Sequence, residues 1–365
     1  MPSSRPLRAR IHLDAICHNY RYAKQLAPHS KALAVVKANA YGHGAVAVAL
    51  ALAECADGFA VACIDEAMEL RDAGLRQPIV LLEGVFHSNE LALVDHAELS
   101  VVIHCQEQLA WLLAARPTRQ FNCWIKIDSG MHRVGFAPAE FAAVYAALRA
   151  CPHVGELVAM THFARADELN SAYTAQQIAT FAQTLAGRTL PRSLANSAAI
   201  LAYPNAHAEW IRPGLMLYGA SPFAEAQPLA TALRPAMTLE SALISVRNLP
   251  AGEPVGYGGS FVCERPTRIG VVAIGYADGY PRHAPTGTPV AVNGQVTRLL
   301  GRVSMDMIAV DLTGIIDANV GAPVELWGTT IAANAVAAAS ETLAYQLFTG
   351  IGRRVAHSYD SWLPV

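Results

Sequence analysis

The chain has 365 residues, of which 53% are hydrophobic and 15% are charged, and its formal net charge is −2 at pH 7. So large an apolar fraction fills a folded core and excludes a disordered chain. A nearly neutral chain offers no strong field to hold nucleic acid or anionic lipid, so we expect neither nucleic acid nor a membrane as a partner. A small uncharged or zwitterionic substrate fits the composition better.

The N-terminal segment and the cysteines indicate a cytoplasmic protein. The opening MPSSRPLRARIHLD lacks the apolar core of a secretory signal. The longest apolar run, 45–53, is about half as long as a bilayer span requires, so it predicts a helix packed inside the protein. The 7 cysteines are scattered and form no C-x-x-C pair, which favours reduced thiols over disulfides or zinc.

Residues 30–220 alternate short apolar runs with segments of helical period, such as 140–151 and 174–187. Continuous apolar runs predict strands buried on both faces, and their alternation with helices predicts a parallel sheet. The runs are 32–37, 58–63, 78–84, 99–105, 123–128, 155–163, 192–197 and 210–219. Eight units predict an α/β fold with a (β/α)8 barrel of the TIM type. A doubly wound sheet is the alternative, but it usually has fewer units and a glycine-rich phosphate loop.

The pattern changes after about residue 232, where helical periodicity fades. The later apolar runs, separated by Gly, Pro and Asn, predict strands of a mainly antiparallel β domain. They are 240–249, 268–276, 289–301 and 306–314. Residues 333–350 are expected to form the one helix of this domain. The predicted boundaries are 10–232 for the barrel and 233–365 for the C-terminal β domain, with residues 1–9 as a candidate extra strand of the latter.

Polar side chains follow the predicted barrel strands at the end where active sites of such barrels lie. They are Lys37, Lys126, Asp128, His162, Asn196, Ser197 and Arg212. No Asp, Glu and His cluster has metal-ligand spacing, so no metal is expected. Ser197 and Gly214 follow the seventh and eighth runs, where barrels often hold a phosphate. Together with the lysine after the first run, they suggest a phosphorylated aldehyde cofactor held as an imine.

Eight motifs follow one another along nearly the whole chain. They are AVVKANAYGHG (34–44), KIDSGMHRVG (126–135), MTHFARAD (160–167), ANSAAI (195–200), RPGLMLYG (212–219), GYGGSF (256–261), GYADGYPR (275–282) and GRVSMD (301–306). In this order they resemble the motifs of the bacterial alanine racemases. The resemblance implies a barrel followed by a β domain, pyridoxal 5'-phosphate as the cofactor, and a homodimer whose active sites are shared across the interface.

The resemblance also implies a cofactor site. In it, Lys37 carries pyridoxal phosphate as an aldimine, and Arg212 faces the pyridine nitrogen. Because arginine keeps its proton at neutral pH, that nitrogen would stay unprotonated. His162 supports this arrangement by a hydrogen bond, either to Arg212 or to the catalytic tyrosine. The phosphate would be bound by Tyr41, Ser197, Gly214, Leu215 and Tyr345.

For the substrate, the resemblance implies two bases on opposite faces of Cα. Lys37 would serve D-alanine, and Tyr257 of the other subunit would serve L-alanine. The substrate carboxylate would be bound by Arg133 and by the backbone N–H of Met305, and Lys126, which is carbamylated in many relatives, would position Arg133. The remaining implied residues are Asp306 as a support and Tyr276, Arg302, Asp167 and Arg282 at the substrate entrance. Ordinary surface ion pairs would explain Arg302 and Asp167 equally well.

We therefore expect an enzyme that interconverts L- and D-alanine, either for peptidoglycan or for alanine catabolism. One alternative is a decarboxylase of the same architecture, which would need a pocket for a long or acidic side chain. Another is a pyridoxal phosphate carrier built on the barrel alone. The GYGGSF motif argues against the decarboxylase, and a large second domain that contributes Tyr257 and Tyr345 argues against the carrier.

Overall fold

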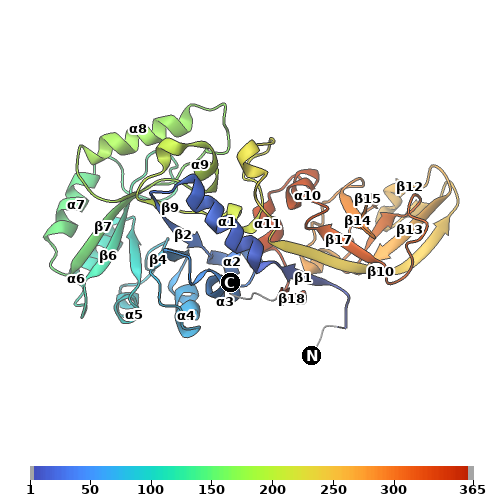
Figure 1. Cartoon of the computed structure of the whole chain (residues 1–365), viewed down its shortest axis with the longest axis horizontal. Coiled ribbons are helices and arrows are strands. Elements are labelled where there is room, and N and C mark those ends of the chain that lie inside the picture. Colours follow the sequence, from blue (N-terminus) through green and yellow to red (C-terminus); the bar gives the residue numbers. More distant parts are fainter. Residues whose placement is uncertain (1–3, 361–365) are drawn as a thin grey trace.

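Eight parallel strands close into the predicted barrel in a computed structural model that describes residues 4–360 (Figure 1). Each of the eight predicted runs overlaps one strand. The strands are β2 (Lys31–Val35), β3 (Gly58–Val61), β4 (Ile79–Leu81), β5 (Ser100–Ile103), β6 (Phe121–Lys126), β7 (Val154–Met160), β8 (Arg192–Ser193) and β9 (Trp210–Ile211). Parallel pairing of β9 with β2 closes the barrel. The closed barrel of parallel strands confirms the fold prediction.

Helices surround the barrel and follow its strands. They are α1 (Leu13–Leu26), α3 (Ala45–Leu52), α4 (Ile64–Asp72), α5 (Leu91–His96), α6 (Gln106–Ala114), α7 (Phe141–Ala150), α8 (Tyr173–Leu185) and the short α9 (Ser197–Ala202). The apolar run at 45–53 forms α3, which buries Val48 and Leu52. Within residues 4–360, no helix combines the length and the apolar character that crossing a membrane requires.

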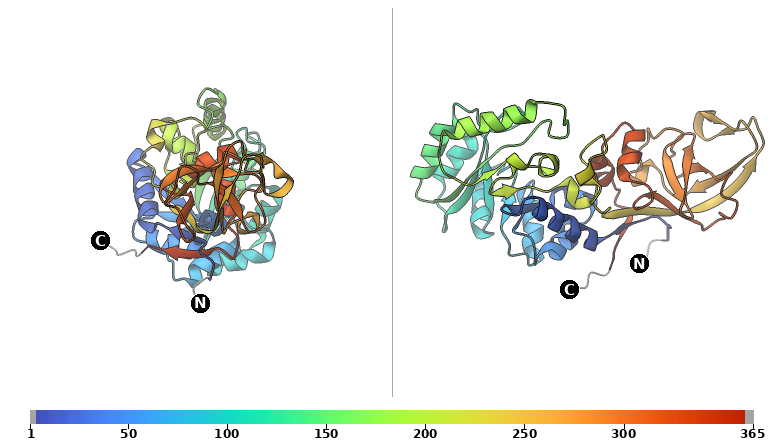
Figure 2. Two further views of the ribbon diagram at one scale, coloured as in Figure 1. Left: turned by 90° about the vertical axis from the view of Figure 1, so that its right-hand side faces the viewer. Right: turned by 45° about the horizontal axis from the view of Figure 1, so that its top comes forward.

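The second domain is a mainly antiparallel sheet at one end of the barrel (Figure 2). Its strand order is β13 (Thr267–Val272), β16 (Ile308–Asp311), β15 (Gln295–Leu300), β14 (Pro289–Val292), β17 (Pro323–Trp327), β10 (Met237–Leu249), β1 (Arg8–Ile11) and β18 (Ala356–Tyr359). The long β10 pairs with β1 and β17 along its first half and with β13 along its second. Asn293 and Gly294 both have positive φ, as the tight turn between β14 and β15 requires.

The N-terminal segment belongs to this sheet in space. β1 lies between β10 and β18, antiparallel to the first and parallel to the second. The chain therefore starts in the second domain and then enters the barrel through α1. Of the predicted boundaries, residues 1–3 and 361–365 lie outside the described residues.

The prediction of one helix over 333–350 is wrong, because the segment forms α10 (Ala333–Ala339) and α11 (Ala344–Thr349). Glu341 adopts a left-handed φ of 51°, and the Thr342 N–H donates to the Ala337 carbonyl at 2.9 Å. Serine and threonine compete with the backbone for hydrogen bonds and favour helix ends, so the sequence Ser-Glu-Thr ends α10. The break redirects α11 towards the barrel (Figure 1).

Candidate functional site

The chain leaves β2 in an unusual turn that carries Lys37 and Tyr41. Four consecutive residues, 38–41, have φ between 51° and 54°, so the segment α2 (Lys37–Gly42) is a left-handed turn. Tyr41 lies within this turn, ahead of the right-handed helix α3, which begins only at Ala45. Left-handed backbone costs roughly 1–2 kcal/mol per non-glycine residue. Surrounding groups must therefore hold the turn in place.

Two side chains brace this turn. Glu66 on α4 accepts the Ala38 N–H at 2.7 Å and, through its other oxygen, the Ala62 N–H at 2.7 Å. Inside the turn, Asn39 Oδ1 accepts the Ala45 N–H at 2.8 Å and so caps the start of α3. These bonds connect the ends of β2 and β3 to one carboxylate.

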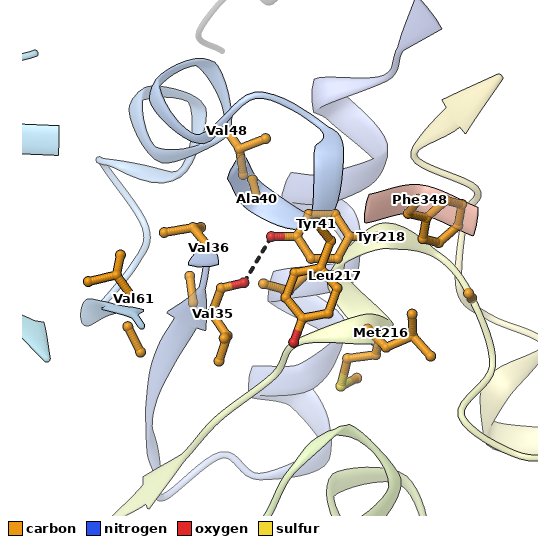
Figure 3. Packing of buried hydrophobic residues seen from close by; sticks show 14 of the residues in the cluster. Val35, Val36, Ala40, Tyr41, Val48, Val61, Met216, Leu217, Tyr218 and Phe348 are labelled. Carbon is orange, nitrogen blue, oxygen red and sulfur yellow. Dashed lines mark hydrogen bonds between the residues drawn. The ribbon is translucent and has the colours of Figure 1, made fainter. Parts of the chain in front are cut away.

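Tyr41 lies at the junction of the two domains. Its ring stacks on Tyr218 with centroids 4.8 Å apart (Figure 3). It also lies 5.9 Å from the ring of Tyr345 on α11. The Tyr218 hydroxyl donates to the Val35 carbonyl at 2.8 Å. Burial raises the pKa of Tyr41 above its usual value and that of Tyr345 to about 12. Both hydroxyls are therefore neutral donors at physiological pH.

Hydroxyls and backbone N–H groups from three loops converge beside Tyr41. Ser197 Oγ accepts the Gly214 N–H at 2.9 Å and the Met216 N–H at 3.2 Å. A Cβ placed on Gly214 would lie only 2.9 Å from the Tyr41 hydroxyl oxygen, so glycine is what lets these loops approach. Leu215 is buried between Gly214 and Met216. Such a set of donors suits a phosphate or another anion.

Arg212 follows β9 and is buried, with 4% of its surface exposed. Nη1 donates to Ser193 Oγ at 2.6 Å, and Nη2 donates to the carbonyls of Thr161 at 2.7 Å and Leu194 at 3.1 Å. In the described part of the chain this cation has no carboxylate partner, and its Nε has no acceptor. Burial lowers its pKa to about 10, so the guanidinium is still protonated at neutral pH.

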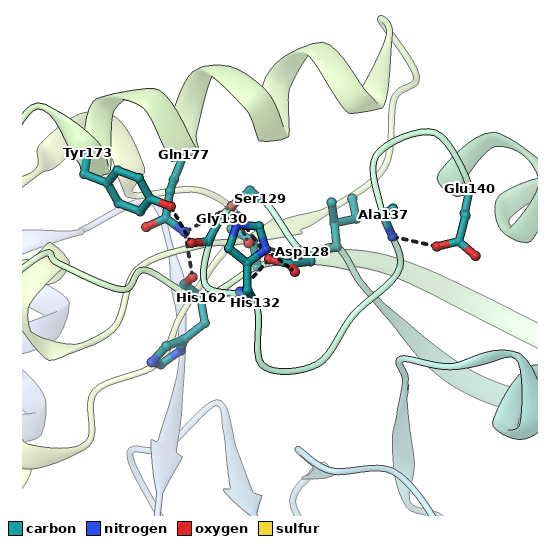
Figure 4. Close-up of polar contacts among 11 residues, drawn as sticks. Asp128, Ser129, Gly130, His132, Ala137, Glu140, His162, Tyr173 and Gln177 are labelled. Atoms are coloured by element: carbon teal, nitrogen blue, oxygen red, sulfur yellow. Dashed lines mark hydrogen bonds and ion pairs between the residues drawn. The ribbon is translucent and has the colours of Figure 1, made fainter.

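His162 follows β7 and contacts Arg212. Its Nδ1 accepts from Arg212 Nη2 at 3.3 Å, and its backbone carbonyl accepts from Gln177 Nε2 at 3.2 Å. The ring points away from Gln177 (Figure 4). Burial and four nearby cations hold the pKa of His162 well below 6.5, so the imidazole is neutral. In order of effect, the cations are Arg212, Lys126, Arg133 and Lys37.

Lys126 is buried at the end of β6, and its pKa lies well below 10.5. The cause is burial first and then the guanidinium groups of Arg212 and Arg133, against which Asp128 acts in the opposite direction. The loop that carries the exposed Arg133 is held by α8, since the Tyr173 hydroxyl donates to the Gly130 carbonyl at 2.7 Å (Figure 4).

The other predicted site residues form a separate group on the second domain. They are Tyr257, Tyr276, Arg282, Arg302, Met305 and Asp306. Tyr257 is 69% exposed and Met305 is 53% exposed. Tyr257 precedes β12 (Phe261–Val262), at the end of this domain that is far from the barrel (Figure 1). Within residues 4–360, no hydrogen bond, ion pair or ring contact joins this group to the barrel residues. Asp167 follows β7 of the barrel and is exposed. After burial, its charge is the second cause that raises the pKa of Tyr345 on α11.

A buried carboxylate organises two loops of the second domain. Asp278 accepts from Arg5 at 2.8 Å, from Arg354 at 2.6 Å and from the Gly275 N–H at 2.9 Å. Arg354 also reaches Asp306 at 2.5 Å. The turn at 275–279 and the loop at 304–306 are thereby held together.

Several residues that shape the site had no predicted role. Tyr218, Thr161 and Asp278 lie inside the motifs RPGLMLYG, MTHFARAD and GYADGYPR, so their membership of those motifs could have signalled them. Glu66 and Ser193 carry no such signal, because only the fold brings Glu66 to the left-handed turn and Ser193 to Arg212.

Known proteins share both domains. The family models "Alanine racemase, N-terminal domain" and "Alanine racemase, C-terminal domain" match residues 11–222 and 236–359. An alanine racemase of Pseudomonas syringae is 56% identical over 98% of this chain and 99% of its own length. The crystal structure of the biosynthetic alanine racemase of Pseudomonas aeruginosa is 51% identical, with a TM-score of 0.95 over 98% of this chain and 100% of that one. The alanine racemase of Bartonella henselae, crystallised with covalently bound pyridoxal phosphate, is 30% identical, with a TM-score of 0.89 over 97% and 99% of the two chains.

Proposed function

The chain belongs to the alanine racemase family, and from this premise we propose that it interconverts L- and D-alanine with pyridoxal phosphate at the mouth of the barrel. The product would supply peptidoglycan or enter alanine catabolism. We place the enzyme in the cytoplasm, where cysteine thiols stay reduced. The observation that carries the proposal is the buried Arg212, a cation with neutral partners and a spare Nε–H.

The residues present fit pyridoxal phosphate at both ends. Ser197, the Gly214 and Leu215 backbone, Tyr41 and Tyr345 would hold the phosphate, because they offer neutral hydroxyls and N–H groups where a Cβ on Gly214 would collide with the Tyr41 hydroxyl. When bound, the cofactor supplies an aldehyde that condenses with an amine and a ring that withdraws electrons from the substrate Cα. Lys37 would be the amine that holds it.

Arg212 would then control the ring nitrogen. A guanidinium N–H donates a hydrogen bond without transferring its proton, so the nitrogen stays unprotonated and the electron withdrawal is moderate. His162 supports this arrangement, because its neutral Nδ1 accepts from Arg212 and adds no further positive charge. Moderate electron withdrawal favours prompt return of the proton to Cα over side reactions.

The proton would move between two bases on opposite faces of Cα. Lys37 Nζ is one, and Tyr257 of the partner subunit is the other. The exposure of Tyr257 at the far end of its own second domain supports its supply by a second copy. Arg133, together with the N–H of the partner subunit's Met305, would bind the carboxylate of alanine. Asp306 would support Met305, and the entrance would be lined by Asp167, Tyr276, Arg282 and Arg302.

Lys126 would be carbamylated. Burial and the neighbouring guanidinium groups hold the pKa of Lys126 well below its usual value, which favours the neutral amine, and a neutral amine adds to carbon dioxide to give a carbamate and a proton. The resulting negative charge would pair with Arg133, whereas an ammonium there would repel it. A carbamate resonance in the NMR spectrum of enzyme supplied with 13C-labelled carbon dioxide, absent from Lys126→Ala, tests the assignment.

The test of the function is exchange at Cα in deuterium oxide, combined with chiral chromatography. Both alanine enantiomers should lose their Cα proton and reach the racemic mixture. Release of carbon dioxide from an amino acid without racemisation would favour a decarboxylase, and cofactor binding without either reaction would favour a carrier.

Mixed dimers test whether the site is shared. Lys37→Ala and Tyr257→Phe should each be inactive alone. A hybrid of the two has one site with both bases, so random mixing should restore about a quarter of the wild-type activity. Because a site built within one subunit would stay inactive on mixing, no recovery would exclude the shared arrangement.

A further inference from the structure

His43, the histidine of the AYGHG motif, is buried beside the left-handed turn and has no part in the proton transfers proposed above. Its Nδ1 lies 2.9 Å from the Tyr41 carbonyl oxygen and 3.1 Å from that of Ala40. Its ring lies 4.5 Å from the Tyr218 ring and 5.1 Å from the Phe348 ring, centroid to centroid. It therefore packs against Tyr218, the ring on which Tyr41 stacks.

The hydrogen-bond pattern fixes the tautomer of His43. Carbonyl oxygens only accept, so Nδ1 carries the proton and donates it. Nε2 is buried, and no group in residues 4–360 pairs with it. A phenylalanine would keep the ring contacts without burying an unpaired nitrogen, which costs about 1–3 kcal/mol. The benefit of a histidine at this position must therefore come from its Nδ1–H.

The Nδ1–H donates into the left-handed turn. Backbone N–H groups already donate to the carbonyls of Val36 (from Ala40, 2.8 Å), Asn39 (from Gly44, 3.0 Å) and Ala40 (from His43, 3.0 Å). The Tyr41 carbonyl takes its donor from a side chain, and buried carbonyls need donors. His43 supplies the donor for the Tyr41 carbonyl, and His357 Nε2 donates to the next carbonyl, that of Gly42, at 2.9 Å. The backbone carbonyl of Tyr41 is thus fixed by the imidazole of His43.

We propose that His43 is a positioning residue for the cofactor phosphate, because its Nδ1–H fixes the Tyr41 carbonyl and thereby keeps the Tyr41 hydroxyl beside Gly214 and Ser197. Rotation of the Tyr41 peptide would swing the side chain away from these donors. The inference rests on the proposed function and adds to it a residue that never touches the phosphate.

Two substitutions separate the N–H from the ring. In His43→Asn the amide nitrogen takes the place of Nδ1 and the ring is lost, whereas in His43→Phe the ring stays and the donor is lost. The readouts are the Kd of the apo-protein for pyridoxal phosphate and for pyridoxal, which lacks the phosphate, and the thermal unfolding midpoint of the apo-protein.

We expect His43→Phe to bind pyridoxal phosphate about tenfold more weakly, the effect of losing one buried hydrogen bond, with unchanged affinity for pyridoxal. His43→Asn should keep most of the phosphate affinity although its unfolding midpoint is the lower of the two. If phosphate affinity follows the unfolding midpoint, or if His43→Phe binds both ligands like the wild type, the inference is overturned. A wild-type protein that binds no pyridoxal phosphate would instead overturn the proposed function.

Two further variants cover the case in which His43→Phe does not fold. His43→Gln carries its amide at the Nε2 position and should lose phosphate affinity that His43→Asn retains. In the Tyr41→Phe background, which lacks the hydroxyl, changing His43→Asn to His43→Gln should have no further effect on affinity. Additive losses would show that His43 acts independently of Tyr41 and would refute the positioning role.

Discussion

The two groups of site residues differ in how the chain holds them. At the barrel mouth, Arg212 and Ser197 are buried and hydrogen-bonded to the loops that carry them, so folding of one chain fixes them. On the second domain, Tyr257 and Met305 are exposed, so the fold of one chain does not fix them against the barrel site. Cofactor affinity should therefore be a property of the single fold, whereas proton transfer should depend on assembly.

The difference also separates stability from activity. A buried guanidinium among neutral acceptors contributes to the packing of its loops, and its loss would leave the Ser193 hydroxyl and two carbonyls without donors. An exposed phenol contributes almost nothing to folding. The two regions should respond to substitution in opposite ways.

The largest effect is expected on the racemisation rate of a Tyr257 variant, which tests this contrast directly. Tyr257→Phe should slow racemisation by about 10²–10⁴-fold, the usual contribution of a general base, and should leave pyridoxal phosphate binding and the unfolding midpoint unchanged. Kinetics in both directions, fluorescence titration and thermal unfolding measure the three quantities. Tyr41→Phe is the matched control, because it removes a buried hydroxyl and should weaken phosphate binding. Equal effects of the two variants on cofactor affinity would contradict the division.

The second prediction concerns the junction between the two regions. A Cβ on Gly42 would lie 2.1 Å from the Phe348 carbonyl oxygen of α11, whereas a Cβ on Gly74 would meet nothing within 4 Å. Both glycines have positive φ, so alanine strains the backbone at each. Gly42→Ala should lower the free energy of unfolding by about 3–5 kcal/mol and Gly74→Ala by about 1 kcal/mol. Urea unfolding of both variants measures the difference, and similar losses would show that α11 moves aside freely.

The third prediction concerns Asp278, which holds together the loops that carry the second-domain site residues. Asp278→Asn keeps the shape but removes the charge that accepts from Arg5 and Arg354, and should cost about 1–3 kcal/mol of stability. The KM for alanine should rise because the loop at 304–306 loosens, while the Kd for pyridoxal phosphate stays constant. Asp72→Asn, the same change at an exposed position, is the control and should alter neither quantity. A weakened cofactor affinity would mean that the two regions are not independent.

The barrel could be predicted because its signal is local. Each buried strand is a short apolar run, and all eight runs were placed. What the sequence did not predict was the backbone conformation at two places. Apolar spacing continues through Ser340–Leu343, where the helix breaks, and nothing in the composition of Ala38–Tyr41 shows that these residues turn left-handed. The helix break follows from local hydrogen-bond competition at Ser-Glu-Thr, and the left-handed turn is held by Glu66 and His43. Apolar periodicity reports neither.

The site was predicted as a set of residues but not as an arrangement. The motifs supplied Arg212 and Ser197, and the structure adds their partners. That Tyr257 lies far from Lys37 along the molecule is a tertiary fact, invisible in the motif GYGGSF. His43 stood inside the motif that supplied Lys37 and Tyr41, and its role emerged only from the burial and direction of its Nδ1.

The smallest expected effect is on the pH dependence of stability, and it arises from His43 in the barrel region. Burial holds the pKa of His43 at about 3, against 6.5 for an ordinary histidine. The charges of His357 and His12 also lower it, the carbonyls of Tyr41 and Ala40 act in the opposite direction, and the Tyr218 ring against it is neutral. The unfolded chain therefore binds one more proton than the folded chain between pH 6.5 and 3. Stability must then fall with falling pH across this window, at up to about 1.4 kcal/mol per pH unit for this group.

His43→Phe removes this proton, so its stability should fall less steeply than that of the wild type between pH 6.5 and 5, while the two slopes agree above pH 7.5. His162, whose pKa is lowered in the same direction, is present in both proteins and cancels in the comparison. Urea unfolding at several pH values gives the two slopes. Identical slopes below pH 6.5 would mean that His43 is already protonated in the folded protein, and a protonated ring would have to find an acceptor for Nε2 that the buried junction does not offer.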